Sequence, residues 1–169
     1  SRGKPDAVRA LADYVIQRHY PDCAATDNPY RSLLEAVAKR QGTLIAHWLL
    51  VGFIHGVMNT DNMAISGETI DYGPCAFMDT LNMQQVYSSI DHHGRYAFDQ
   101  QPQIGYWNLT QLATSLMPLL SGAEESAQEV AGAALEVYAR TFEATWHAGL
   151  GNKIGLVNPR DGDDELVMD

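Results

Sequence analysis

The spacing of apolar positions predicts a chain built mainly of helices. Between Pro5 and Pro21 the apolar residues recur three and four positions apart, which is the period of one buried helical face. Proline suits the first turn of a helix and also ends one. A second helix is predicted after Asp27-Asn28-Pro29, because these residues can cap a helix and fill its first turn. Its apolar face continues to about His55.

The second half of this helix is apolar on nearly every side, which places it at the centre of the core. The longest apolar run, residues 43–58, is shorter than the roughly 20 residues that a membrane span needs. We therefore expect a buried helix and no membrane partner. We expect no signal peptide, because the first residues contain no apolar segment of the kind such a peptide needs.

After His55 the helical period stops. Residues 63–65 and 68–70 flank Ser66-Gly67, and this pattern predicts a tight hairpin in which glycine supplies a positive φ. Residues 79–102 show no period and are expected to be irregular.

Two further helices complete the prediction. One runs from about Trp107 to Leu119 and ends at Ser121-Gly122, and the other covers residues 123–146 and ends at Gly149-Leu150-Gly151. The predicted fold class is mainly α with a small β-hairpin, in one domain over residues 1–169. Aromatic residues on the apolar faces are expected in the core: Trp48, Phe53, Trp107, Tyr138 and Trp146.

Composition narrows the class of protein. Apolar residues make up 46% of the chain and charged residues 19%, as in globular proteins. The net charge is −10 and no basic stripe is present, which argues against a nucleic-acid partner. Cys23 and Cys75 are too few for a disulfide framework and are expected to be reduced thiols.

Candidate chemistry gathers between His55 and Pro74. Asp61 and Asn62 are adjacent, and Asp71 follows the predicted hairpin. Carboxylate and amide oxygens can hold a hard divalent cation. Protein kinases hold their metal ions with the Asn of a catalytic loop and the Asp of an Asp-Phe-Gly turn. Because Asp and Asn are also common turn formers, the residue types alone leave both readings open.

The stretch from His55 to Asp79 resembles the signature of the selenoprotein O family, a protein-kinase-like group. Other stretches agree with the same family: residues 13–16, 19–21, 37–41, 89–96, 101–102 and 107–109. The resemblance covers nearly the whole chain. It implies a protein-kinase-like C-terminal lobe and transfer of AMP from ATP to Ser, Thr or Tyr hydroxyls of proteins. It also implies a flipped nucleotide and Mg²⁺ or Mn²⁺ as the metal.

The resemblance assigns roles to the candidate residues. In an ordinary kinase the base Asp stands two residues after the loop His. Here that position is Val57, which cannot accept a proton. By resemblance, Asp61 is the proton acceptor, Asn62 and Asp71 hold the metal, and Asp71 is also the cofactor-binding residue. We expect His55 to be structural and to bond the loop backbone.

The chain lacks the parts of a kinase that grip phosphate. It has no Gly-rich loop and no strand lysine, since its only lysines are Lys4, Lys39 and Lys153. In the family these parts lie N-terminal to the stretch present here. We therefore expect a fragment that misses the N-terminal lobe and the C-terminal end, and that alone binds ATP weakly and is nearly inactive. The expected compartment is the bacterial cytoplasm, or mitochondria in a eukaryote.

Two alternatives stay open, and a third is disfavoured. The same fold can catalyse conventional phosphate transfer, or it can bind a nucleotide as a pseudokinase scaffold without catalysis. Asp91-His92-His93 is shared with metal-dependent phosphoesterases, but those enzymes need further acidic motifs on a parallel sheet that this sequence does not predict. We expect the Asp91–Arg95 segment to brace the catalytic region.

Overall fold

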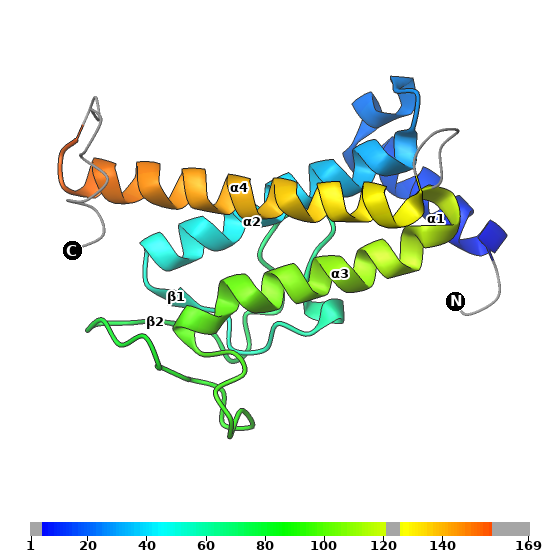
Figure 1. The fold of residues 1–169 in the computed structure, drawn as a ribbon. Helices are drawn as coiled ribbons and strands as arrows, with labels where there is room; N and C mark the ends of the chain where they lie inside the picture. Colours follow the sequence, from blue (N-terminus) through cyan, green and yellow to red (C-terminus); the bar gives the residue numbers. More distant parts are fainter. Residues whose placement is uncertain (1–4, 121–125, 157–169) are drawn as a thin grey trace.

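The computed structural model describes residues 5–120 and 126–156 and has a mainly helical fold with one small antiparallel sheet (Figure 1). This confirms the predicted fold class at that level. In chain order the elements, in which η marks a short 3₁₀ helix, are α1 (Pro5–His19), η1 (Pro21–Ala25), α2 (Pro29–Leu50), β1 (Phe53–Ile54), η2 (Thr60–Asn62), β2 (Ala76–Phe77), η3 (Phe98–Gln100), α3 (Gln101–Leu120) and α4 (Ala127–Lys153).

Three long helices form the body of the molecule. α4 packs along α2, and α3 packs against both of them (Figure 1). The close approach depends on glycine. A Cβ on Gly42 of α2 would lie 2.9 Å from the carbonyl oxygen of Tyr138 in α4, and a Cβ on Gly105 of α3 would lie 2.3 Å from Cδ1 of Ile45. The Tyr138 hydroxyl donates to the carbonyl of Pro102 at 2.8 Å, and burial raises its pKa, so it remains a donor.

Residues at the helix starts cap them as expected. The side chain of Asn28 accepts the N–H of Arg31 at 3.1 Å. Before α4, Ser126 and Glu129 form a capping box in which each side chain accepts the N–H of the other. The hydrogen bonds that Ser126 donates lower the pKa of the Glu129 carboxyl. The predicted start of this helix at residues 123–125 lies outside the described residues.

α2 ends at Leu50, so the prediction that this helix continues to about His55 is wrong. Gly52 has a φ of +70°, a left-handed conformation that glycine adopts at little cost and that stops the helix. The apolar run then continues as β1, where both residues are buried and pair with β2. A short apolar run does not distinguish a buried strand from a buried helix.

The predicted hairpin is reduced to a single bridge between Met63 and Thr69, with Gly67 at a φ of +79°. The sheet in the described part of the chain is formed by β1 and β2 instead. In residues 64–66, within and just after the first predicted strand, the backbone carbonyls accept hydrogen bonds from side chains of other segments, so they are not available to a strand ladder. These pairs are Gln41 with Ala64, Tyr20 with Ile65 and Arg40 with Ser66.

The last two helices are longer than predicted. α3 begins at Gln101, before the expected start near Trp107, and its predicted end at residues 121–122 lies outside the described residues. α4 continues to Lys153, so Gly149-Leu150-Gly151 does not end it. Gly149 serves packing, because a Cβ there would lie 2.2 Å from Cδ1 of Leu50.

One of the expected core aromatic residues is on the surface. Trp107 is 41% exposed, and the guanidinium of Arg95 lies over its ring at 4.9 Å. Trp146 is half-buried. The other three expected core aromatics, Trp48, Phe53 and Tyr138, are buried.

Candidate functional site

The loop that follows β1 begins with a fully buried histidine. The His55 ring lies beside the rings of Trp48 and Phe53, at centroid distances of 5.5 and 6.4 Å. Its Nε2 lies 2.8 Å from the carbonyl oxygen of Ile70. Because a carbonyl oxygen only accepts, Nε2 carries the proton and donates. The structural role expected for His55 is confirmed, and the bond reaches the residue just before Asp71.

Two buried amide side chains of α3 hold the same loop. Gln101 accepts the N–H of His55 and donates to the carbonyl of Phe53, both at 2.9 Å. Asn108 donates to the carbonyl of Met58 at 3.0 Å. Both amide side chains are at least nine-tenths buried. The backbone from residue 53 to 58 is therefore fixed at three points by one helix.

The start of the loop also contacts the chain on the far side of Asp71. Gly56 has a φ of +87°, and a Cβ on it would lie 2.6 Å from the carbonyl oxygen of Pro74. Only glycine fits such an approach without a shift. His55 and Gly56 thus contact residues 70 and 74, and the short segment that contains Asp71 is held at both ends.

Residues 64–69 lie across α2 and are held by polar side chains. Gln41 donates to the carbonyl of Ala64 at 2.6 Å, and Trp48 Nε1 donates to Thr69 Oγ1 at 2.9 Å. The Tyr20 hydroxyl donates to a third partner, the carbonyl of residue 65. Burial raises the pKa of Tyr20 more than the nearby guanidinium lowers it, so this hydroxyl stays protonated.

The three candidate residues lie on the loop that follows β1 and on the segment that His55 and Gly56 contact. Asp61 and Asn62 are in η2, where Asp61 is exposed and Asn62 is partly buried. Asn62 Nδ2 donates to the carbonyl of Val57 at 3.0 Å, which leaves its Oδ1 as the atom for a ligand. Asp71 is exposed and has a φ of +55°, a conformation in which Asp is several-fold enriched. Within the described chain no hydrogen bond joins Asp71 to either residue of η2.

The donor set suits a hard divalent cation. Asn62 and Asp71 offer an amide oxygen and a carboxylate, the ligand types that Mg²⁺ and Mn²⁺ prefer. Residues 5–120 and 126–156 contain no group of three or more His, Cys, Asp or Glu side chains placed to hold a metal. A cation held by Asn62 and Asp71 would therefore take its other ligands from water and from a nucleotide's phosphates.

The Asp91 segment braces the loop as expected. Both carboxylate oxygens of Asp91 accept backbone N–H groups, from Arg95 at 2.9 Å and from Tyr96 at 2.7 Å. The Tyr96 hydroxyl in turn donates to Asn59 Oδ1 at 2.6 Å. Asp91 is therefore occupied as a turn-stabilising acceptor, which argues against the metal site of a phosphoesterase.

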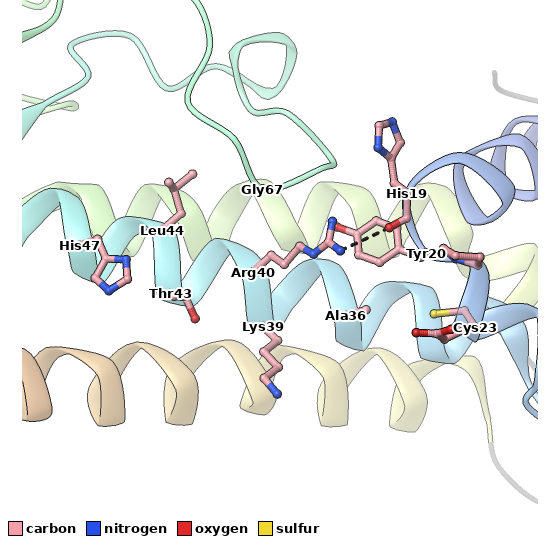
Figure 2. Close-up of a pocket in the computed structure, with 12 residues that line it drawn as sticks. His19, Tyr20, Cys23, Ala36, Lys39, Arg40, Thr43, Leu44, His47 and Gly67 are labelled. Carbon is pink, nitrogen blue, oxygen red and sulfur yellow. Dashed lines mark hydrogen bonds between the residues drawn. The ribbon is translucent and has the colours of Figure 1, made fainter.

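A separate hollow of about 590 Å³ lies beside α2 (Figure 2). Arg40 crosses it, donating to the carbonyls of His19 and Ser66 and stacking on the Tyr20 ring at 4.2 Å. In Figure 2 the side chains of Lys39 and His19 extend to opposite sides, so the cations do not converge on one point. Arg40 here joins the loop at Gly67 to the end of α1.

The residues that support the loop were not predicted from the sequence. Gln101, Asn108 and Gln41 are buried polar side chains that bond loop carbonyls or N–H groups. The available signal was polar residues interrupting apolar helical faces, since buried polar groups require partners. Nothing in the sequence identified those partners, which are 23 to 50 residues away.

Comparisons with known proteins show the family of this chain. The family model described as Protein adenylyltransferase SelO matches residues 1–169. Two relatives named Protein nucleotidyltransferase YdiU, from Rhizobium etli and from Methylorubrum extorquens, are each 58% identical, over 99% and 100% of this chain. A third with that name, from Rhodopseudomonas palustris, is 57% identical over the full chain.

The chain spans about a third of the length of these relatives, 34% in each case. No helix in the described residues is long and apolar enough to cross a membrane. The match of the family model over every residue, together with the identity to the relatives, shows that the chain belongs to the SelO family of protein adenylyltransferases.

Proposed function

We propose that this chain is the part of a protein adenylyltransferase that transfers AMP from ATP to a Ser, Thr or Tyr hydroxyl of a protein. The observation that carries the proposal is the bond from His55 to the Ile70 carbonyl, which ties the loop of Asp61 and Asn62 to the segment of Asp71. The family of the chain supports the same reaction. The relatives reported above are bacterial, which supports the bacterial cytoplasm as its location.

In this reaction the acceptor hydroxyl attacks the α-phosphorus of ATP. The bond between the α-phosphorus and its bridging oxygen to the β-phosphate breaks, and pyrophosphate leaves. Asp61, exposed in η2, takes the hydroxyl proton as general base. Asn62 and Asp71 hold the Mg²⁺ or Mn²⁺ ion, which supplies charge neutralisation for the phosphate oxygens. The supported loop keeps these groups in one orientation, as catalysis by positioning requires.

We further propose that residues 1–169 form a kinase-like C-terminal lobe. The helical body, the small sheet and the loop order support this assignment. The nucleotide then needs phosphate-binding groups from the rest of a protein of the relatives' length. On that basis this chain alone binds ATP weakly and turns over little, and micromolar affinity measured by calorimetry would contradict this.

The test is incubation of the full-length protein with ATP labelled at the α-phosphate and a mixture of protein acceptors, with and without Mn²⁺. We expect metal-dependent labelling and an added mass equal to AMP on a hydroxyl side chain. Added phosphate would show a conventional kinase, and nucleotide binding without labelling would show a scaffold. Labelling that persists unchanged in Asp71→Asn would contradict the proposed site.

A further inference from the structure

A hollow of about 740 Å³ borders the loop just before Asp61. Asn59 and Val57 of the loop form one side, and residues 90–96 form another. Asn59 is two residues from Asp61, at most about 7 Å along the chain. In Figure 1 the irregular green segment before α3 extends away from the helical body.

The acidic and loop-amide acceptors beside this hollow bond groups of the chain itself. Both carboxylate oxygens of Asp91 are bonded to backbone N–H groups. Asn59 Oδ1 accepts the Tyr96 hydroxyl. Asp99, next to the lining residue Gln100, accepts the side-chain amides of Gln84 and of Gln100 at 2.8 and 3.0 Å. The two carboxylates and Asn59 Oδ1 are therefore engaged before a ligand enters the hollow.

The donor groups, by contrast, are available. Arg95 stacks over Trp107 at 4.9 Å and over Tyr96 at 5.7 Å, and in the described chain its guanidinium makes no hydrogen bond or ion pair. His92 and His93 are exposed, and each imidazole carries at least one N–H in any protonation state. These ring contacts use none of the guanidinium N–H groups, which leaves them for bidentate binding of a carboxylate.

We propose that this hollow docks the protein acceptor and selects substrates with an Asp or Glu close to the modified hydroxyl. Arg95 binds the acidic side chain, and His92 and His93 add donors beside it. The proposal rests on the proposed function, because it places the acceptor hydroxyl near Asp61. In a chain with a net charge of −10, a donor-rich hollow beside the loop favours an acidic partner locally.

The test uses the full-length protein and two synthetic peptides that contain one Ser and differ only in flanking residues, Glu in one and Gln in the other. We expect kcat/KM for AMP transfer to be roughly tenfold higher for the Glu peptide, mainly through KM. Arg95→Gln should remove this preference, and Arg95→Lys should keep part of it. Arg140→Gln, at an exposed arginine of α4, is the matched control and should leave the preference unchanged.

Charge reversal separates selection from a structural effect. Arg95→Glu should lose activity on the Glu peptide and gain activity on a peptide in which Lys flanks the Ser. If Arg95→Gln instead raises KM for ATP and leaves the peptide preference intact, the hollow belongs to the nucleotide and the inference is wrong. Equal use of both peptides by the wild type would also overturn it.

A binding measurement separates a failure of this inference from a failure of the proposed function. Fluorescence anisotropy of the labelled peptides, without ATP, should give weaker binding of the Glu peptide to Arg95→Gln. Arg95-dependent binding without any AMP transfer by the wild type would contradict the proposed function alone. AMP transfer to peptides whose binding and use ignore Arg95 would contradict the inference alone.

Discussion

His55 Nε2 lies 2.8 Å from the carbonyl oxygen of Ile70, so a buried imidazole in one loop fixes the backbone that presents Asp71 in the next. Replacing His55 with phenylalanine keeps a ring in the core but leaves this carbonyl without its donor. We expect a loss of about 1–3 kcal/mol in the free energy of unfolding. AMP transfer should also fall, because the position of Asp71 is less well defined.

Urea denaturation of the protein and initial rates of AMP transfer check this prediction. His47→Phe is the matched control, since His47 is exposed on α2. Wild-type stability and rate in His55→Phe would show that the bond has no such role.

At Asp71 the effect of removing the charge can be measured without adding backbone strain. Asp71 has a φ of +55°, which Asn tolerates well and Ala does not. Asp71→Asn should therefore fold like the wild type and lose metal-dependent activity. Titration with Mn²⁺ should show weaker metal dependence in this variant, whereas an unchanged metal titration would exclude Asp71 as a ligand.

Asp61→Asn should keep nucleotide and metal binding and lose the proton acceptor. General-base catalysis contributes about 10²–10⁴-fold to a rate. We expect kcat to fall by roughly that factor with little change in KM for ATP, measured by steady-state kinetics with labelled ATP. A fall in ATP affinity of the same size would assign Asp61 to nucleotide binding instead.

The Gln101 side chain holds the loop through two hydrogen bonds. Gln101→Leu fills similar space but leaves a buried N–H and a buried carbonyl unpaired, each at a cost of about 1–3 kcal/mol. We expect this variant to be strongly destabilised in thermal unfolding. Gln17→Leu, at an exposed position of α1, is the control and should change the unfolding temperature little.

Two glycine substitutions should have opposite effects. At Gly105 an added Cβ would lie 2.3 Å from Ile45 and 2.6 Å from the Tyr138 hydroxyl, so Gly105→Ala should destabilise the protein by about 1–3 kcal/mol. At Gly132 of α4 nothing lies within 4 Å of the added Cβ. Gly132→Ala should therefore stabilise by roughly 0.5–1 kcal/mol. Denaturant midpoints of the two variants give the comparison.

The capping box of α4 predicts a pH dependence of stability. Hydrogen bonds from Ser126 lower the folded-state pKa of Glu129, so the unfolded state binds protons more readily. This contribution is complete above the ordinary Glu value and is lost as the pH falls through the lowered one. In melting curves from pH 7 to 3, Glu129→Gln should flatten that part of the acid dependence, and Glu136→Gln should not.

The sequence predicted the helices but not the contacts that hold the loop. Helical periods and cap residues such as Asn28 gave the starts of α1 and α2 closely. The predicted end of α2 was wrong. The helix stops before Gly52, and the apolar residues after it form β1, which is buried by pairing with residues 76–77. A local pattern does not contain this pairing. Gly149 was misread as a helix end for the same reason, since its packing partner is on another helix.

The candidate site divides in a similar way. Asp61, Asn62 and Asp71 came from local motifs and a family resemblance. Asp61 and Asp71 are exposed, Asn62 is partly buried, and the roles of all three stay predictions. Their support by Gln101, Asn108 and Gln41 depends on tertiary contacts across 23 to 50 residues. Those contacts are set by packing of the helices.

The cross-links from α2 to residues 64–69 have an implication for engineering. Arg40 and Gln41 bond backbone carbonyls that a hairpin ladder could otherwise use, and Trp48 bonds the Thr69 side chain, so the loop is not a self-contained module. A chimera that grafts residues 59–71 onto another scaffold must transplant these helix positions with it. Without them, we expect the grafted segment to lose its conformation although its sequence is unchanged.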